Sequence, residues 1–133
     1  MPIERFNTPE LRISPGFPAA SVAPAGRIVF INGQVSRDRD GVLVGAGDHV
    51  AQARQAFLNL RHALTAAGAT GRDVVQYRIT VTGDAQALVG PIMSTVHDIF
   101  IDDPIEAPSI FVGATLLGRA EYLVEIEAVA SLG

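Results

Sequence analysis

The sequence predicts an α+β domain in which two helices cover one face of a mixed β-sheet. The chain has 133 residues, of which 48% are apolar, so it can bury one sizeable core. Two long segments repeat apolar residues at helical spacing, and six shorter segments are rich in β-forming residues or alternate between apolar and polar. We therefore expect a single domain spanning residues 1–133.

The N-terminal part of the chain is expected to supply three short strands. The first lies near residues 3–6, the second at 21–23, and the third within "RIVFIN", where Val29, Phe30 and Ile31 favour a strand. Gly26, in the "PAG" stretch between the second and third, suits a tight hairpin turn. The following stretch, "GQVSRDRDGVLVGAG", is predicted to be a loop.

The first helix is predicted over residues 48–67. Apolar residues there recur at steps of three and four, which gathers them on one face: Val50, Ala53, Phe57, Leu60, Leu64 and Ala67. Asp48 can cap the start of this helix and Gly68 can end it.

The second helix is predicted between Asp84 and Phe100. Pro91 stands where it would kink this helix or begin its main part. The inward side chains are expected to be Leu88, Ile92, Val96, Ile99 and Phe100.

Three further strands are predicted, one between the two helices and two at the end of the chain. Residues 74–82 alternate, with Val75, Tyr77, Ile79 and Val81 on one face. Residues 109–116 and 122–130 are expected to form the last two strands, joined by a turn around Gly118. Glu125 and Glu127 point to the same side of the final strand, which leaves one face of the sheet only partly apolar.

The composition argues against several classes of function. The formal net charge is −4, lysine is absent, and the ten Lys and Arg positions are therefore all arginines, scattered along the chain, so nucleic-acid binding is not expected. There is no cysteine, and His49, His62 and His97 are too far apart in the pattern to suggest a metal site. No phosphate loop or dinucleotide motif is present, so no cofactor is expected. Without a membrane-length apolar segment or a signal-peptide core, we expect no membrane partner and a cytoplasmic protein.

Three stretches, in order along the chain, resemble the Rid family (reactive intermediate deaminase, RidA/YjgF-like, once labelled endoribonuclease L-PSP). They are "RIVFINGQV", "AQARQAFLNLRHALTAAGATGRDVVQYRITVT" and "LVEIEAVA". The resemblance implies a chorismate-mutase-like fold, which we expect here as a mixed six-stranded sheet with both helices on one face. It also implies a homotrimer whose sheets form a central barrel, with a small-molecule pocket in each cleft between subunits.

The resemblance further implies a chemistry. In active members an arginine at the start of the penultimate strand binds the substrate carboxylate through two parallel hydrogen bonds. A glutamate on the last strand positions the water that hydrolyses a 2-imino or enamine acid to a 2-keto acid and ammonia.

The family pattern transfers only in part to this sequence. The arginine position falls on Pro108, just before Ser109, whereas the glutamate falls on Glu125. The glycine beside the pocket is Gly33, and the serine before it is replaced by Asn32.

Three other positions of the pattern also differ. The aromatic residue of the N-terminal loop falls near Ala19, and a small polar or cysteine position after the arginine falls on Ile110. An asparagine of the second helix falls near Gly90. Arg78 and Thr80 lie on the strand that borders the pocket in the family, so they complete the predicted ligand-binding set.

The roles of the charged residues stay open at this level. Glu125 either positions a water molecule or is a structural carboxylate satisfied inside the trimer, and Glu127 is expected to serve the trimer interior. Arg78 either replaces the missing cation, forms an ion pair with Glu125 or Glu127, or faces solvent.

The leading functional hypothesis is a Rid-family homotrimer that binds a small metabolite between its subunits, without the usual 2-imino acid deaminase activity. The first alternative is an enamine or imine hydrolase that acts on a non-standard substrate, with Glu125 positioning water. An RNA-cleaving protein, as the older family label suggests, fits poorly with an acidic chain that lacks lysine. A structural or regulatory trimer without a ligand is the remaining alternative.

Overall fold

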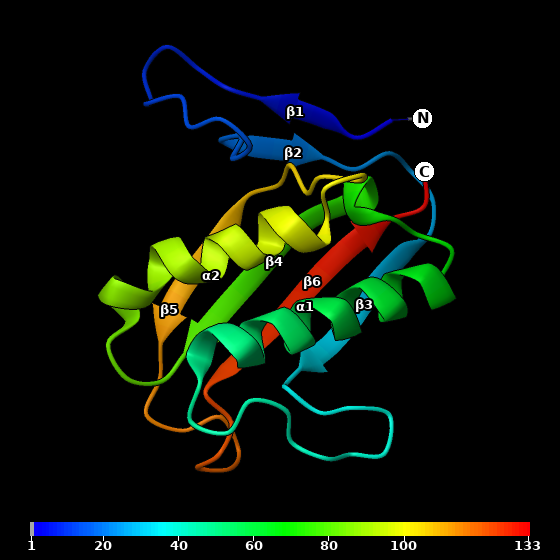
Figure 1. The fold of residues 1–133 in the computed structure, drawn as a ribbon. Helices are drawn as coiled ribbons and strands as arrows, with labels where there is room; N and C mark the ends of the chain where they lie inside the picture. Colours follow the sequence, from blue (N-terminus) through cyan, green and yellow to red (C-terminus); the bar gives the residue numbers. More distant parts are fainter. Residues whose placement is uncertain (1) are drawn as a thin grey trace.

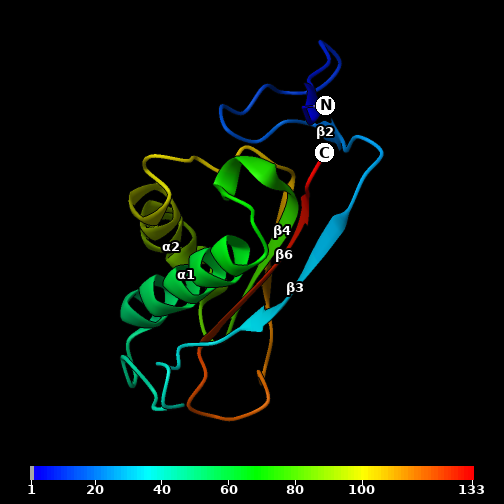
Figure 2. The same ribbon diagram turned by 90° about the vertical axis from the view of Figure 1, so that its right-hand side faces the viewer.

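The computed structural model describes residues 2–133 and has two layers, with both helices on one face of a β-sheet (Figures 1 and 2). The helices are α1 (His49–Ala66) and α2 (Ala85–Ile99), and a short 3₁₀ turn covers Gly71–Asp73. The strands are β1 (Glu4–Phe6), β2 (Ala20–Val22), β3 (Ile28–Gln34), β4 (Val74–Val81), β5 (Ser109–Gly113) and β6 (Val124–Ser131). The predicted α+β class and the two helices are confirmed.

The six strands form two sheets, so the expectation of one six-stranded sheet is wrong. The main sheet has the order β3-β6-β4-β5, in which β6 runs antiparallel to β3 and β4 while β4 and β5 are parallel. Strands β1 and β2 pair only with each other and lie beyond the end of the main sheet where β4 and β5 begin (Figure 1). The main sheet is mixed, as predicted.

The hairpin predicted at Gly26 does not form, because β3 takes its partner from the C-terminus. Strand β6 is eight residues long and pairs with β3 over most of its length, whereas β2 is only three residues long. The Leu132 N–H donates to the Arg27 carbonyl and extends this pairing. Gly26 packs so closely against the last residue that an added Cβ would lie 3.1 Å from the carbonyl carbon of Gly133.

The ends of α1 and most of its buried face follow the sequence prediction, although Val50 and Ala67 are only half-buried. The Asp48 side chain accepts a hydrogen bond from the Ala51 N–H at 3.0 Å, and Gly68 has the left-handed φ of 81° that ends many helices. The pattern did not predict that Gln52 is also fully buried. Its amide donates to the Gly45 and Glu121 carbonyls and accepts from the Leu123 N–H, which ties α1 to two loops.

Helix α2 runs continuously past Pro91, and Asp84 caps its start. Pro91 lies on the exposed face, where water can satisfy the carbonyl that its missing N–H leaves free. The inward residues Ile92, Val96, Ile99 and Phe100 are buried as predicted, and Leu88 is half-buried against the core.

The core lies between the helices and one face of the main sheet. Tyr77, Ile79 and Val81 of β4 face the helices as predicted, but Val75 is only half-buried because the β4–β6 pairing shifts between Val74 and Gln76. The last two strands are both shorter than predicted and do not pair with each other. Residues 114–123, which contain Gly118, connect them past the end of β4. Over residues 2–133 no helix has the length and apolar character to cross a membrane.

Candidate ligand-binding site on the open face of the sheet

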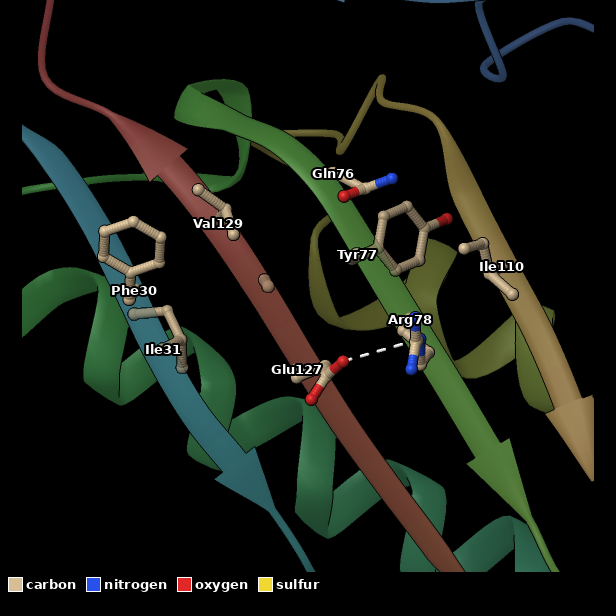
Figure 3. Close-up of a pocket in the computed structure, with 9 residues that line it drawn as sticks. Phe30, Ile31, Gln76, Tyr77, Arg78, Ile110, Glu127 and Val129 are labelled. Atoms are coloured by element: carbon tan, nitrogen blue, oxygen red, sulfur yellow. Dashed lines mark ion pairs between the residues drawn. The ribbon is translucent and has the colours of Figure 1, made fainter. Parts of the chain in front are cut away.

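Both helices lie on one side of the main sheet and leave its other face free (Figure 2). Exposed apolar side chains are frequent on that free face. Phe30 has 79% of its surface exposed, and Ile28, Ile110 and Val112 are also exposed. This face has a hollow of about 260 Å³. Its lining residues extend from Phe30 on one side to Ile110 on the other (Figure 3). An apolar surface of this kind on a small domain is typical of an interface or a binding site.

The strand register brings Gly33, Thr80 and Glu125 together on this open face. Thr80 and Glu125 are directly opposite each other on β4 and β6, so their side chains point to the same side. A Cβ added to Gly33 would lie 2.5 Å from Oε1 of Glu125, so the carboxylate occupies the space next to the glycine backbone. The three residues therefore form one cross-strand row, as the family resemblance implies.

The Glu125 carboxylate is half-buried, and among residues 2–133 it forms no ion pair and accepts no side-chain hydrogen bond. A partly buried carboxylate without a partner is costly, so this group is suited to accept a hydrogen bond from water, a ligand or another chain. Glu125 is therefore available for a further partner.

Arg78 forms an ion pair with Glu127 and not, within residues 2–133, with Glu125. Its Nε lies 3.5 Å from Oε1 of Glu127, and both side chains are about half exposed, at 50% and 53% (Figure 3). Ile110 is opposite Arg78 on β5, so these three residues make the next row of the open face. Asn32 is exposed, and its carbonyl accepts a hydrogen bond from the Gln34 side chain at 2.8 Å.

Pro108 enters β5 without disturbing the sheet. Its carbonyl accepts a hydrogen bond from the Tyr77 N–H at 3.2 Å. In a parallel ladder of this register, an N–H at position 108 would donate to the Val75 carbonyl. That carbonyl instead accepts from the Ser21 hydroxyl at 2.8 Å, so the missing N–H leaves no unpaired acceptor and the β1–β2 sheet gains an attachment point.

Ser109 lies opposite Tyr77 and therefore points to the helix side of the sheet. Tyr77 is 1% exposed, and this burial raises the pKa of its hydroxyl to about 12, while a hydrogen bond with the Ser109 side chain acts in the opposite direction. Ser109 is thus not part of the row that contains Glu125.

The comparisons with known proteins agree with the fold and with the resemblance. The family model described as Endoribonuclease L-PSP matches residues 14–132. The chain belongs to this family, the Rid family. A Rid-family protein of unknown function from Yersinia pestis, YyfB, is 34% identical; the match covers 99% of this chain and 100% of that one, with a TM-score of 0.91.

Two further Rid-like structures are similar over nearly the whole chain. YyfA from Yersinia pestis is 26% identical, with 98% and 99% of the two chains covered and a TM-score of 0.70. A putative endoribonuclease from Thermotoga maritima is 27% identical, with 98% of each chain covered and a TM-score of 0.69. The family recognised from the three sequence stretches is therefore confirmed.

In this Rid protein, the predicted ligand-binding residues separate into two groups at opposite ends of β4. Gly33 and Glu125 lie beside Thr80, near the end of the strand. Pro108 and the loop carrying Ala19 lie near Val75, at its start. Val75 and Thr80 are five residue steps apart along the strand, which corresponds to about 17 Å. A single chain therefore does not bring the two groups into contact.

Sequence reasoning overlooked two residues near these groups. Phe17, which is 39% exposed, is the aromatic residue of the loop that carries Ala19. The sequence signal that could have found Phe17 is its position, because it is an aromatic residue only two positions before Ala19. Gln76 lines the hollow on the open face between Arg78 and the start of β4 (Figure 3). The alternating pattern placed it on the polar face, but only the pairing of β4 with β6 shows that it lies over Val129.

Proposed function

We propose that this Rid protein is a homotrimer that binds a small metabolite in the clefts between its subunits and lacks the usual 2-imino acid deaminase activity. The observation that carries the proposal is Pro108. It stands at the start of β5, where the family resemblance implies the arginine that binds the substrate carboxylate. Proline has neither a charge nor an N–H, so it cannot bind a carboxylate as arginine does.

Two features of the chain support assembly through the open face. The apolar residues of that face, with Phe30 the most exposed, have no covering element within residues 2–133. The two groups of predicted site residues lie at opposite ends of β4, so a shared site requires that they come from different subunits. Three sheets that turn their open faces toward a common axis would satisfy both requirements.

The chemistry around Pro108 favours a ligand without a carboxylate. Ala19 and Ile110 are apolar at positions where the family pattern has an aromatic and a small polar residue, and Arg78 is paired with Glu127. Removing one partner of a buried, bidentate charge pair costs on the order of 2–5 kcal/mol of binding. A neutral ligand, or one that hydrogen-bonds to Glu125, avoids that loss.

A coupled deaminase assay tests the proposal. An amino-acid oxidase generates the 2-imino acid, and the rate of its hydrolysis is followed with and without this protein. We expect the wild-type protein to leave the rate unchanged, whereas Pro108→Arg should introduce binding of benzoate, used as a carboxylate probe. Efficient hydrolysis by the wild-type protein would overturn the proposal. Sedimentation of the same sample measures whether it is a trimer.

The partnerless carboxylate of Glu125 favours one second candidate, an enamine or imine hydrolase with a non-standard substrate. A half-buried carboxylate next to the Gly33 backbone can hold a water molecule and accept a proton from it. If the protein hydrolyses an enamine, Glu125→Gln should abolish the activity. Glu127→Gln is the matched control, because it alters the neighbouring carboxylate that is engaged by Arg78.

A further inference from the structure

A second pocket lies on the helix side of the sheet, away from Glu125. Its volume is about 300 Å³, within the range of small-molecule sites. It is bounded by the N-terminal loop, the C-terminal part of α2 and residues 104–106, and its main lining residues are Phe17, Met93, Val96, Ile101, Ile105 and Glu106. None of the predicted ligand-binding residues lines it, and it shares with the proposed cleft only the N-terminal loop that carries Phe17 and Ala19.

The walls of this pocket are held by hydrogen bonds, so the pocket is formed before any ligand arrives. The Phe17 N–H donates to the Ser14 carbonyl at 2.9 Å, which fixes the turn that carries the aromatic ring. The Arg5 guanidinium donates to the backbone carbonyls of Glu106 and Arg72, which fastens β1 to the wall at residues 104–106. Buried Phe100 and Tyr77 contribute to the lining from the core.

Among the side chains that line this pocket, a negative charge is present and no arginine offsets it. Glu106 is its one acidic lining residue among those the structure describes, and its side chain is exposed. His97 also lines the pocket, and its Nδ1 lies 3.7 Å from the carboxylate of Asp98. No arginine is among the lining residues, and Arg5 directs its hydrogen bonds to main-chain carbonyls. An apolar body fits the walls, and a cation fits the rim better than an anion.

We propose that this helix-side pocket binds a small primary amine with an aromatic or branched aliphatic body. The apolar body packs among Phe17, Met93 and Ile105, and the ammonium group lies toward Glu106. The ligand class differs from the carboxylates that arginine-bearing members of the family bind, and the site lies within one subunit.

Met93 offers a direct reporter, because the sequence has only two methionines, Met1 and Met93. The full chain is labelled with ¹³C at the methionine methyl groups, and the Met93 resonance is assigned with Met93→Leu. It is then titrated with three probes of one size: 2-phenylethylamine, 2-phenylethanol and phenylacetate. We expect the Met93 methyl signal to shift in a saturable way with the amine, more weakly with the alcohol, and not with the carboxylate.

Two pairs of variants test the role of charge at the rim. Glu106→Gln should weaken binding of the amine about threefold and leave the alcohol unaffected, as expected for one exposed charge pair. Glu10→Gln removes an acidic side chain that does not line the pocket and is its control. Ile101→Lys, at an exposed lining position, should abolish the preference for the amine, whereas Val89→Lys, at an exposed position of α2 that does not line the pocket, should keep it.

Each of the other outcomes would overturn the proposal. No shift of Met93 with any probe would mean that the pocket is closed in solution or covered by a neighbouring subunit. Equal shifts with all three probes, unchanged in Glu106→Gln, would show apolar binding without selection for an amine. Because Glu125 is not involved, Glu125→Gln should leave the titrations unchanged, so failure of the cleft proposal is distinguishable from failure of this one.

Discussion

The two faces of the main sheet carry side chains from the same strands but differ in how their apolar surface is covered. On the helix side, Val81, Val124 and Ile126 are completely buried by α1 and α2. On the open side, the same strands present Glu125, Arg78 and exposed apolar residues such as Phe30. The helix side gives the single chain its stability, and the open side carries surface that only a ligand or another chain can cover.

The largest expected effect comes from the helix side. Ile126→Ala removes a fully buried side chain from the central strand β6 and should lower the free energy of unfolding by about 3 kcal/mol. Chemical denaturation followed by circular dichroism measures this loss. A loss of less than 1 kcal/mol would mean that the core around β6 can close over the cavity.

Phe30→Asp should produce a comparable effect on assembly. A charge on the most exposed apolar residue of the open face should weaken association of the proposed trimer by about 3 kcal/mol, roughly a hundredfold. Sedimentation velocity across a dilution series measures the change. Leu11→Asp, at an exposed apolar residue of the N-terminal loop, is the control. If both variants assemble like the wild type, the open face is not the interface.

Gln52→Leu tests the buried polar contact between α1 and its loops. The variant leaves the carbonyls of Gly45 and Glu121 and the N–H of Leu123 without their partner, which should cost about 2 kcal/mol. Gln55→Leu on the same helix is the control, because within residues 2–133 the Gln55 side chain bonds only to the Asn59 side chain. Equal losses in the two variants would contradict a special role for Gln52.

Tyr77 should make stability depend on pH in the alkaline range. Its folded pKa of about 12 lies above the ordinary value of 10.0, so the unfolded chain loses the proton first. The contribution of Tyr77 to stability is fully present below pH 10 and is lost as the pH rises from 10 toward 12. At pH 11 the loss in the free energy of unfolding should be on the order of 1 kcal/mol. The measurement is denaturation of wild type and Tyr77→Phe at pH 8 to 11. The difference between them should stay constant if Tyr77 does not titrate as described.

The smallest effect on stability is expected for Gly33→Ala. The new methyl group would collide with the end of the Glu125 side chain, which can swing aside, so the change should be below about 1 kcal/mol. The displaced carboxylate should nevertheless alter any activity or binding that depends on Glu125. Crystal structures of the variant and the wild type measure the displacement directly. An unmoved carboxylate would mean that the backbone shifts instead.

Local features of the sequence were sufficient for the helices. Asp48 and Gly68 act on the backbone within a few residues of themselves, so the start and end of α1 are readable without the fold. Strand pairing depends on residues far apart in the chain. The prediction therefore found all six strands but mistook the partner of β3 and merged two sheets into one.

The candidate site shows the same division. The resemblance named Gly33 and Glu125, and the register places them in contact across β3 and β6. It also named Ala19, Pro108 and Ser109, but nothing in the linear pattern indicated that they lie at the other end of β4 or that Ser109 faces Tyr77. A side chain's place along a strand is set by its pairing partner, which sequence order does not specify.

The sequence by itself determined the α+β class, the helix boundaries, the family and the chemistry of position 108, where proline excludes both charge and an N–H. Only the tertiary structure decided how the fold accommodates that proline. The Ser21 hydroxyl donates a hydrogen bond to the Val75 carbonyl, with which Pro108 cannot pair, and Ser21 belongs to the separate β1–β2 sheet. The reason is physical: a missing donor is a property of one residue, whereas its replacement must come from whatever the folded chain places within hydrogen-bond distance.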